Sequence, residues 1–216
     1  MEAADTKDSP RGPLRVLASD VVATLLMETV IPTFLSEYPH VQLELVANSA
    51  FVDIVAEGFD AAFRLSDDVP KDMIALKFGA PSCMKVVGSP AYLKGRHLPV
   101  SPEELEVLDC VRSRPATGIP YRWEFEKGRK KISIEPKGAF TVNRSELALQ
   151  AALRGLGVSY VPEKLCRAHL ETGALVSLLD DWSSLYEGLR LYYPGHRLVP
   201  PALRAFINVV KTSELA

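Results

Sequence analysis

Cysteine is scarce in this chain of 216 residues, and its three copies lie far apart. Cys83, Cys110 and Cys166 form no CxxC pair, and their number is odd. This pattern argues against a disulfide framework and against a zinc site, so we expect three small buried hydrophobic residues. The sequence predicts neither a metal ion nor a cofactor.

Long apolar runs and an excess of positive charge are also missing. Runs such as 21–27 fall well short of the roughly 20 residues that cross a bilayer, and residues 1–12 are polar and acidic, unlike a signal peptide. The chain holds 25 Lys and Arg against 27 Asp and Glu, a formal net charge of -2, without the basic excess that nucleic acid selects. We therefore expect a soluble cytoplasmic protein that contacts neither membrane nor, by itself, DNA.

Familiar catalytic motifs are absent as well. The four histidines are scattered, and no HExxH, P-loop or GxSxG occurs. A GxG stands at 155–157, but Tyr160 occupies the position where a dinucleotide-binding fingerprint needs its third glycine. We expect no catalytic residue and no enzymatic activity.

What the chain does contain is an alternation of strand and helix patterns, with 47% hydrophobic residues to fill a core. Apolar residues alternate with polar ones at 41–47, and short strands are expected at 14–18, 60–64 and 74–78. Between them we expect a helix that starts at Ser19 or Asp20 and breaks at Pro32, and a short helix at 51–57. This order is typical of a parallel, doubly wound α/β sheet.

Two lobes are expected. Residues 83–88 look like a crossing into a second lobe, and a strand at 189–193 looks like the return. We predict lobe I at 13–86 plus 192–216 and lobe II at 87–191, joined by two strands. Residues 1–12 are interpreted as a linker or a remnant added for expression.

Six stretches carry a resemblance to a known family. They are 11–16, 34–39, Val52-Asp53-Ile54-Val55-Ala56-Glu57-Gly58-Phe59-Asp60-Ala61-Ala62-Phe63-Arg64, 87–93, 151–158 and 201–206. In this order they resemble the effector-binding domain of LysR-type transcriptional regulators over nearly the whole chain. Each motif alone has little specificity, and their family order carries the assignment.

The resemblance implies a fold and a role. It implies two α/β lobes around a hinge cleft, similar to periplasmic solute-binding proteins of type 2, with a small-molecule effector in the cleft. It also implies a homodimer or tetramer, in which the helix at 23–35 meets the one after Asn143. The family's winged helix-turn-helix is absent here, so DNA would be bound only through that missing part.

Candidate ligand-binding residues follow from the strand-end rule and the family pattern together. They are Ser19, Asp20, Arg64, Arg112, Thr117, Gly118, Asn143 and Tyr160. Four of them have structural alternatives. Ser19 with Asp20 is either an anion-binding turn or a plain N-cap, Arg64 either forks onto a ligand carboxylate or pairs with Asp20, and Tyr160 is either a cleft wall or a core residue.

Two other function classes share this architecture. A solute-binding protein of a transporter would need a signal peptide, and an enzyme on the same scaffold would need a nucleophile and a base. The residues upstream of Met1 in the reading frame would discriminate between the regulator and these alternatives.

Overall fold

The computed structural model describes residues 9–48, 50, 52–64, 72–79, 81–114, 118–186, 188–195 and 198–213. Contacts divide the chain into two compact units: unit 1 is Met1–Ala80 with Glu187–Ala216, and unit 2 is Pro81–Tyr186. The two crossings therefore fall a few residues before the expected 86/87 and 191/192. The cause is strand pairing, since β5 (Ser82–Gly88) pairs wholly within unit 2 and β13 (Leu189–Pro194) wholly within unit 1.

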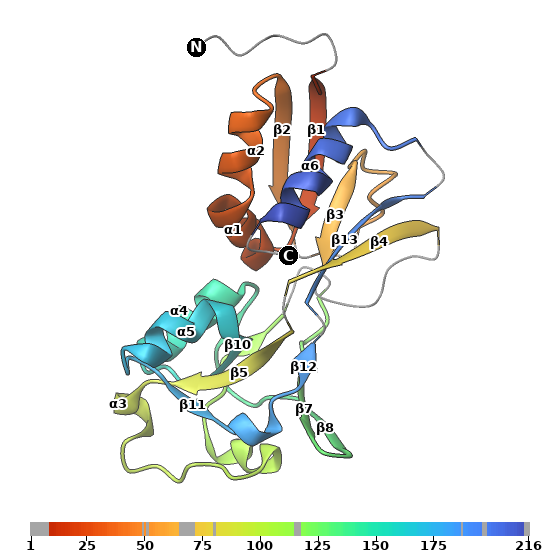
Figure 1. Cartoon of the computed structure of the whole chain (residues 1–216). Helices are drawn as coiled ribbons and strands as arrows, with labels where there is room; N and C mark the ends of the chain where they lie inside the picture. The colour runs from red at the N-terminus through yellow and green to blue at the C-terminus, as the bar shows by residue number, and fades with distance from the viewer. Residues whose placement is uncertain are drawn as a thin grey trace. The chain divides into compact units, whose positions relative to one another are not determined.

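Unit 1 is built on a five-stranded sheet in the order β2-β1-β3-β13-β4 (Figure 1). Its other strands are β1 (Gly12–Ala18), β2 (Val41–Ala47), β3 (Ala61–Arg64) and β4 (Met73–Phe78). β1 runs parallel to β2 and β3, whereas β13 runs antiparallel to β3 and β4. The expected parallel sheet is confirmed for its first three strands, and the returning strand is inserted between β3 and β4.

Three helices cover one face of this sheet. α1 (Asp20–Thr29), α2 (Ile31–Glu37) and α6 (Pro201–Thr212) share one hydrophobic cluster with β1, in which Phe34 meets Phe206 edge to face at 5.1 Å between ring centroids. The break between α1 and α2 at Val30 confirms the interruption expected from Pro32, because proline is tolerated only in the first turn of a helix.

The opposite face of the sheet is covered by a loop, where the sequence predicts a helix at 51–57. That prediction is wrong for the described residues 52–57, which form a single turn. The Asp53 carboxylate accepts from the amides of Val55 and Ala56 at 2.9 and 3.1 Å, and Gly58 ends the turn with φ +73°. Ile54 and Phe59 from this loop bury themselves against the sheet. Only one helical turn fits between these two anchors.

Unit 2 has β5 at the centre of a mostly antiparallel sheet. β5 pairs with β10 (Ser159–Pro162), β11 (Val176–Leu178) and β12 (Leu185–Tyr186). A parallel bridge between Cys110 and Val158 connects this sheet to the parallel pair β6 (Arg112–Ser113) and β9 (Thr141–Val142). β7 (Trp123–Lys127) and β8 (Lys130–Ile134) form a hairpin, and Gly128 in its turn has φ +61°.

Two cores lie on the two faces of the unit 2 sheet. α4 (Ser145–Leu153) and α5 (Glu163–Glu171) bury their apolar side chains in one of them. α3 (Pro90–Leu93), the 3₁₀ turns η1 (Pro102–Val107) and η2 (Asp180–Trp182), and the hairpin build the other. All three cysteines are buried, as expected. No helix in the described part of the chain is long and apolar enough to span a bilayer.

Candidate functional site

The carboxyl ends of the parallel strands of unit 1 meet at one edge of the sheet. Leu17 of β1 pairs with Ala62 of β3, so continuing that register places Ser19 level with Arg64. Arg64 in turn pairs with Arg190 of β13, and Arg190 pairs with Lys77 of β4. We call Ser19, Arg64, Arg190 and Lys77 the strand-end row. Ligands of open α/β sheets bind at such strand ends.

Ser19 is the residue before α1, as the sequence predicts, but its side chain does not act as a cap. The Ser19 carbonyl accepts the Ala23 amide at 2.8 Å, which starts the helix. The Ser19 Oγ atom is buried and makes no hydrogen bond to the described residues. A buried hydroxyl without a partner costs free energy, so this atom and the first amides of α1 are suited to bind a ligand oxygen.

Asp20 follows as the first residue of α1. A carboxylate in the first turn is stabilised by the helix dipole, and the Asp20 carbonyl accepts from Thr24 Oγ1 at 3.1 Å. Asp20 therefore has a structural role in addition to its place beside Ser19.

Arg64 ends β3 and is oriented by Tyr192. The Arg64 Nε donates to the Tyr192 hydroxyl at 2.8 Å, and the guanidinium carbon lies 5.7 Å from the centre of the same ring. This contact with the core tyrosine of β13 fixes the direction of the guanidinium at the edge of the sheet.

Sequence reasoning missed Arg190 and Lys77. Their signal was present: each is the single basic residue near one end of a largely apolar strand. Because residues paired across strands lie on the same face, three cations stand next to one another on β3, β13 and β4. These side chains place three cationic donor groups on one face of the sheet.

In unit 2, Arg112 begins β6 and Asn143 lies just beyond the end of the neighbouring strand β9. Arg112 pairs with Thr141, and Asn143 follows β9 directly. The Arg112 Nε is buried and makes no hydrogen bond to the described residues, while its Nη2 lies 3.8 Å from Glu135 Oε1. Asn143 is exposed. Arg112 belongs to β6 itself, not to the loop that follows.

The remaining candidates of unit 2 divide into three cases. Gly118 is exposed and has φ +77°, which glycine adopts at little cost. Thr117 lies outside the described residues. Tyr160 is buried, stacks on Trp123 with ring centroids 5.3 Å apart and donates to the Glu124 carbonyl at 2.6 Å, so the structure supports its core interpretation. Burial raises its pKa far above the usual range.

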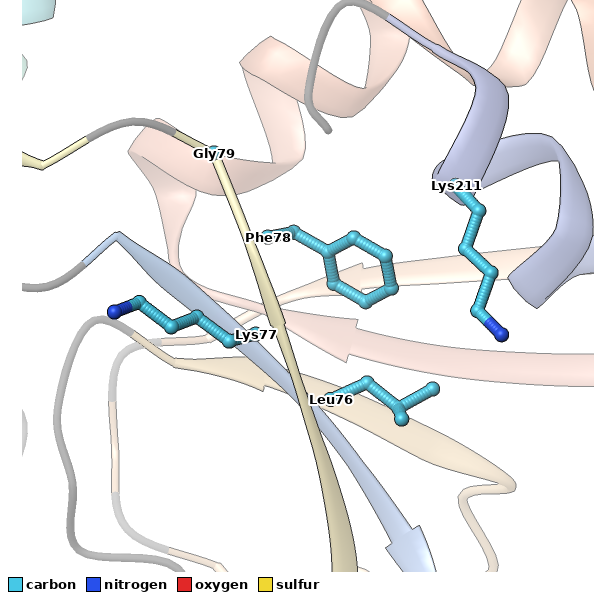
Figure 2. Close-up of a pocket in the computed structure, with 5 residues that line it drawn as sticks. All are labelled: Leu76, Lys77, Phe78, Gly79 and Lys211. Atoms are coloured by element: carbon cyan, nitrogen blue, oxygen red, sulfur yellow. The ribbon is translucent and has the colours of Figure 1, made fainter.

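A separate cavity of about 450 Å³ lies beside the edge strand β4 (Figure 2). Its lining residues are Leu76, Lys77, Phe78, Gly79 and Lys211. The side chains of Leu76 and Phe78 point toward Lys211 on α6, while the side chain of Lys77 points to the other face of the strand (Figure 2). The cavity and the strand-end row therefore use opposite faces of β4.

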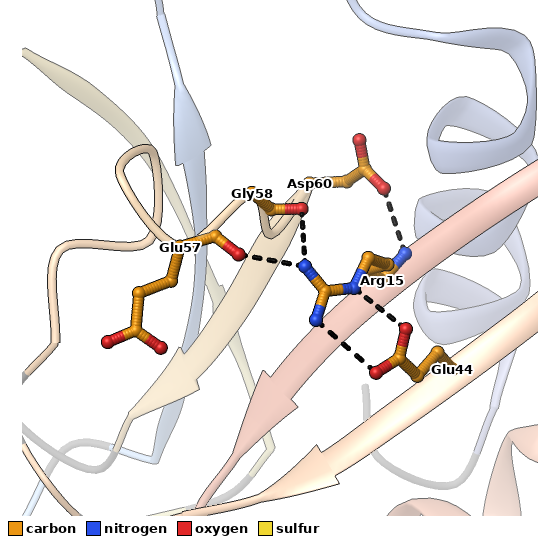
Figure 3. A network of polar contacts seen from close by, with 5 residues as sticks. All are labelled: Arg15, Glu44, Glu57, Gly58 and Asp60. Carbon is orange, nitrogen blue, oxygen red and sulfur yellow. Dashed lines mark hydrogen bonds and ion pairs between the residues drawn. The ribbon is translucent and has the colours of Figure 1, made fainter.

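One network fixes the loop that covers the other face of the unit 1 sheet (Figure 3). Arg15 on β1 donates to the Glu44 carboxylate of β2 at 2.7 and 3.3 Å and to the Glu57 and Gly58 carbonyls at 2.8 and 3.2 Å. The Asp60 carboxylate accepts the Arg15 amide at 2.8 Å. The guanidinium thus ties the end of the loop to two strands.

Similarity to known proteins extends over nearly the whole chain. The profile of the LysR substrate binding domain matches residues 7–214. A Pseudomonas aeruginosa protein assigned as a transcriptional regulator is 36% identical over 97% of this chain and 69% of its own length. The HTH-type transcriptional regulator YcaN of Escherichia coli is 34% identical over 99% of this chain and 70% of its own length.

Solved structures show the same fold. CrgA, a LysR-type regulator from Neisseria meningitidis, superimposes with a TM-score of 0.79 at 23% identity, covering 96% of this chain and 70% of that one. The full-length AphB of Vibrio cholerae does so with a TM-score of 0.79 at 24% identity, covering 96% and 72%. The chain belongs to the LysR substrate-binding domain family, the effector-binding regulatory domain of LysR-type transcriptional regulators.

Proposed function

We propose that this domain senses a small anionic effector at the strand-end row of unit 1. The observation that carries the proposal is the register that aligns Ser19, Arg64, Arg190 and Lys77 at one sheet edge. Ser19 Oγ and the first amides of α1 would donate to the anion, and the guanidinium groups would form charge-assisted bonds with it. An effector with two or more carboxylates matches three cations better than one with a single carboxylate.

Within unit 2 we propose Arg112 and Asn143 as ligand-binding residues. The buried Nε of Arg112 supports this role, because a ligand oxygen would satisfy it. Thr117 and Gly118 follow in the same segment and remain proposed contacts. A ligand that binds one arrangement of a two-unit domain more tightly than another shifts the population toward it, which is how binding becomes a signal.

The experiment is a thermal-shift and calorimetric screen of di- and tricarboxylates, each beside its uncharged amide. Anions should raise the melting temperature in a concentration-dependent way, and their amides should not. Arg190→Gln should weaken binding of the best anion by about 10-fold or more, the cost of a hydrogen bond to a charged group. Arg129→Gln, on the exposed turn of the hairpin, is the matched control and should bind normally.

Two results would contradict the proposal. The first is equal binding of acids and amides, which would show that charge is not recognised. The second is unchanged anion affinity in both Arg190→Gln and Ser19→Ala, which would remove the strand-end row from the site.

We infer further that the domain works as a homodimer. Met27 on α1, Leu35 on α2 and Leu147 on α4 are large apolar residues that remain 55%, 42% and 48% exposed. These are the helices that the family resemblance pairs across a dimer. A two-fold interface would bury these side chains on both protomers.

We also propose a cytoplasmic location and no enzymatic activity. The curated relatives are transcriptional regulators, which act where the DNA is. In the full-length protein the DNA contact would come from a separate helix-turn-helix domain.

A further inference from the structure

We propose that the cavity beside β4 is a second small-molecule site, which takes an amphipathic monoanion with a flat apolar body, such as a small aryl carboxylate. The cavity, of about 450 Å³, falls within the size range of ligand pockets and lies within unit 1. Lys77 belongs both to its lining and to the strand-end row, but the Lys77 side chain points to the opposite face of β4 (Figure 2).

The floor of the cavity is apolar. Leu76 and Phe78 are two residues apart on β4, so they share the face that α6 covers, and both contact the main core of unit 1. Phe78 is only 5% exposed and Leu76 is half-buried, so the floor is continuous with a rigid core. Such a surface binds the flat body of a ligand by excluding water from it.

The rim of the cavity carries one cation. Lys211 lies in the last turn of α6 and is exposed, and it forms no ion pair with the described residues. Figure 2 shows its side chain on the same side of β4 as Leu76 and Phe78. An apolar floor with a single ammonium group at its rim is complementary to a ligand with one carboxylate and no other charge.

The position of the cavity connects it to both chain crossings. Its wall ends at Phe78 and Gly79, immediately before the chain leaves unit 1. A Cβ at Gly188, where the chain has just returned, would lie only 2.6 and 2.7 Å from the carbonyl oxygens of these two residues. A ligand in this cavity would therefore touch backbone on which both connections depend.

The test is an NMR titration: 3-phenylpropionate is added to the isotopically labelled domain, and the chemical shifts of the backbone amides are recorded at each concentration. The amides of Leu76, Phe78, Gly79 and Lys211 should move together and saturate. Lys211→Gln should weaken binding about two- to fivefold, the range for an exposed ion pair. The uncharged 3-phenylpropanol should bind wild type with the same reduced affinity. Lys94→Gln, on an exposed lysine of unit 2, is the matched control.

Shifts confined to Ser19, Arg64 and Arg190 would overturn the second site and leave the effector site standing. Absence of saturable shifts in the low millimolar range would overturn it too. If the acid and the alcohol bind equally, and Lys211→Gln binds as wild type does, the assignment to an anionic ligand is wrong. Because Phe78 is core, the variants avoid it and each is expected to fold.

Discussion

At the scale of single residues, Arg15 shows how one side chain can organise three segments (Figure 3). Its hydrogen bonds to Glu44 are the main cause that lowers the pKa of Glu44 and raises the pKa of Arg15. The guanidinium also lies 4.7 Å from the centre of the Phe59 ring. Arg15 thereby anchors the loop whose residues Ile54 and Phe59 close one face of the sheet.

The pH dependence of this contact can be predicted. Because the folded pKa of Glu44 lies below its unfolded value of about 4.3, the stabilisation is present above that pH and is lost as the pH falls through the folded pKa. We expect Glu44→Gln to melt below wild type at pH 7, and the gap to close below about pH 4. A gap that is constant with pH, measured by circular dichroism, would refute this account. Arg15→Lys should also melt lower, since an ammonium cannot hold the bidentate contact.

The three cysteines give a second prediction at this scale. Burial raises the pKa of Cys110 to about 12 and of Cys166 to about 11, and it raises the pKa of Cys83 as well. Since the thiolate is the reactive form, a thiol reagent such as DTNB at pH 8 should label the native domain slowly and all three sites rapidly in urea. Fast labelling of the native domain would contradict the burial of these thiols.

The raised pKa values of the cysteines also predict that the folded domain is less stable at alkaline pH. The folded pKa values lie above the unfolded value of about 8.5, so the stability that the neutral thiols contribute is complete below that pH and falls as the pH rises toward the folded values. The urea midpoint should therefore drop between about pH 8.5 and 10.5. Cys110→Ala should show a smaller drop, and an unchanged slope would exclude Cys110 as a cause.

At the scale of elements, Gly188 lies where the chain returns into unit 1, and the backbone around it leaves no room for a side chain. Gly188 has φ +71°, and a Cβ there would meet two carbonyl oxygens well inside contact distance. Gly128 in the hairpin has φ +61° with open space around it. Substitution of Gly128 therefore measures the cost of a left-handed backbone alone. Substitution of Gly188 measures that cost together with the cost of a steric clash.

We expect Gly128→Ala to destabilise the domain by about 1 kcal/mol through its backbone conformation alone. Gly188→Ala should cost about 3 kcal/mol, because the backbone carbonyls must also move. Urea denaturation of both variants checks this. Equal losses would mean that the strand ends at Phe78 and Gly79 adjust without cost.

Elements with a regular pattern of apolar residues, or with a proline at a break, were predictable from the sequence. Elements whose conformation depends on tertiary packing were not. The alternation at 41–47 gave β2, and Pro32 marked the break between α1 and α2. The loop at 52–59 has helix-like spacing, yet Asp53 closes one turn and the burial of Phe59 prevents a second. The boundaries of the units moved because β5 pairs along its whole length with strands that are distant in sequence.

The candidate site shows the same limit. Ser19 and Arg64 were found because each follows or ends a predicted strand. Arg190 and Lys77 were missed because their proximity depends on the insertion of β13 between β3 and β4, which is a long-range pairing. The sequence around Tyr160 fits a cleft residue and a core residue equally well. Its burial, its stacking on Trp123 and its hydrogen bond to the Glu124 carbonyl support the core interpretation.

At the scale of the whole molecule, the exposed apolar residues of α1, α2 and α4 test whether the domain assembles through the inferred face. Sedimentation of wild type at micromolar concentrations should show a dimer. Met27→Glu should give a monomer with an unchanged circular dichroism spectrum. A two-fold interface would bury one unpaired carboxylate from each protomer, which costs free energy. Leu147→Glu should have the same effect from unit 2.

Leu198 supplies the control for this experiment. It is 97% exposed and lies on none of these helices, so Leu198→Glu adds the same charge elsewhere and should remain a dimer. If Met27→Glu and Leu147→Glu also remain dimers, the subunits meet through a different surface. If wild type is a monomer at high micromolar concentration, the exposed side chains of α1 and α4 do not provide enough apolar area for association by the isolated domain.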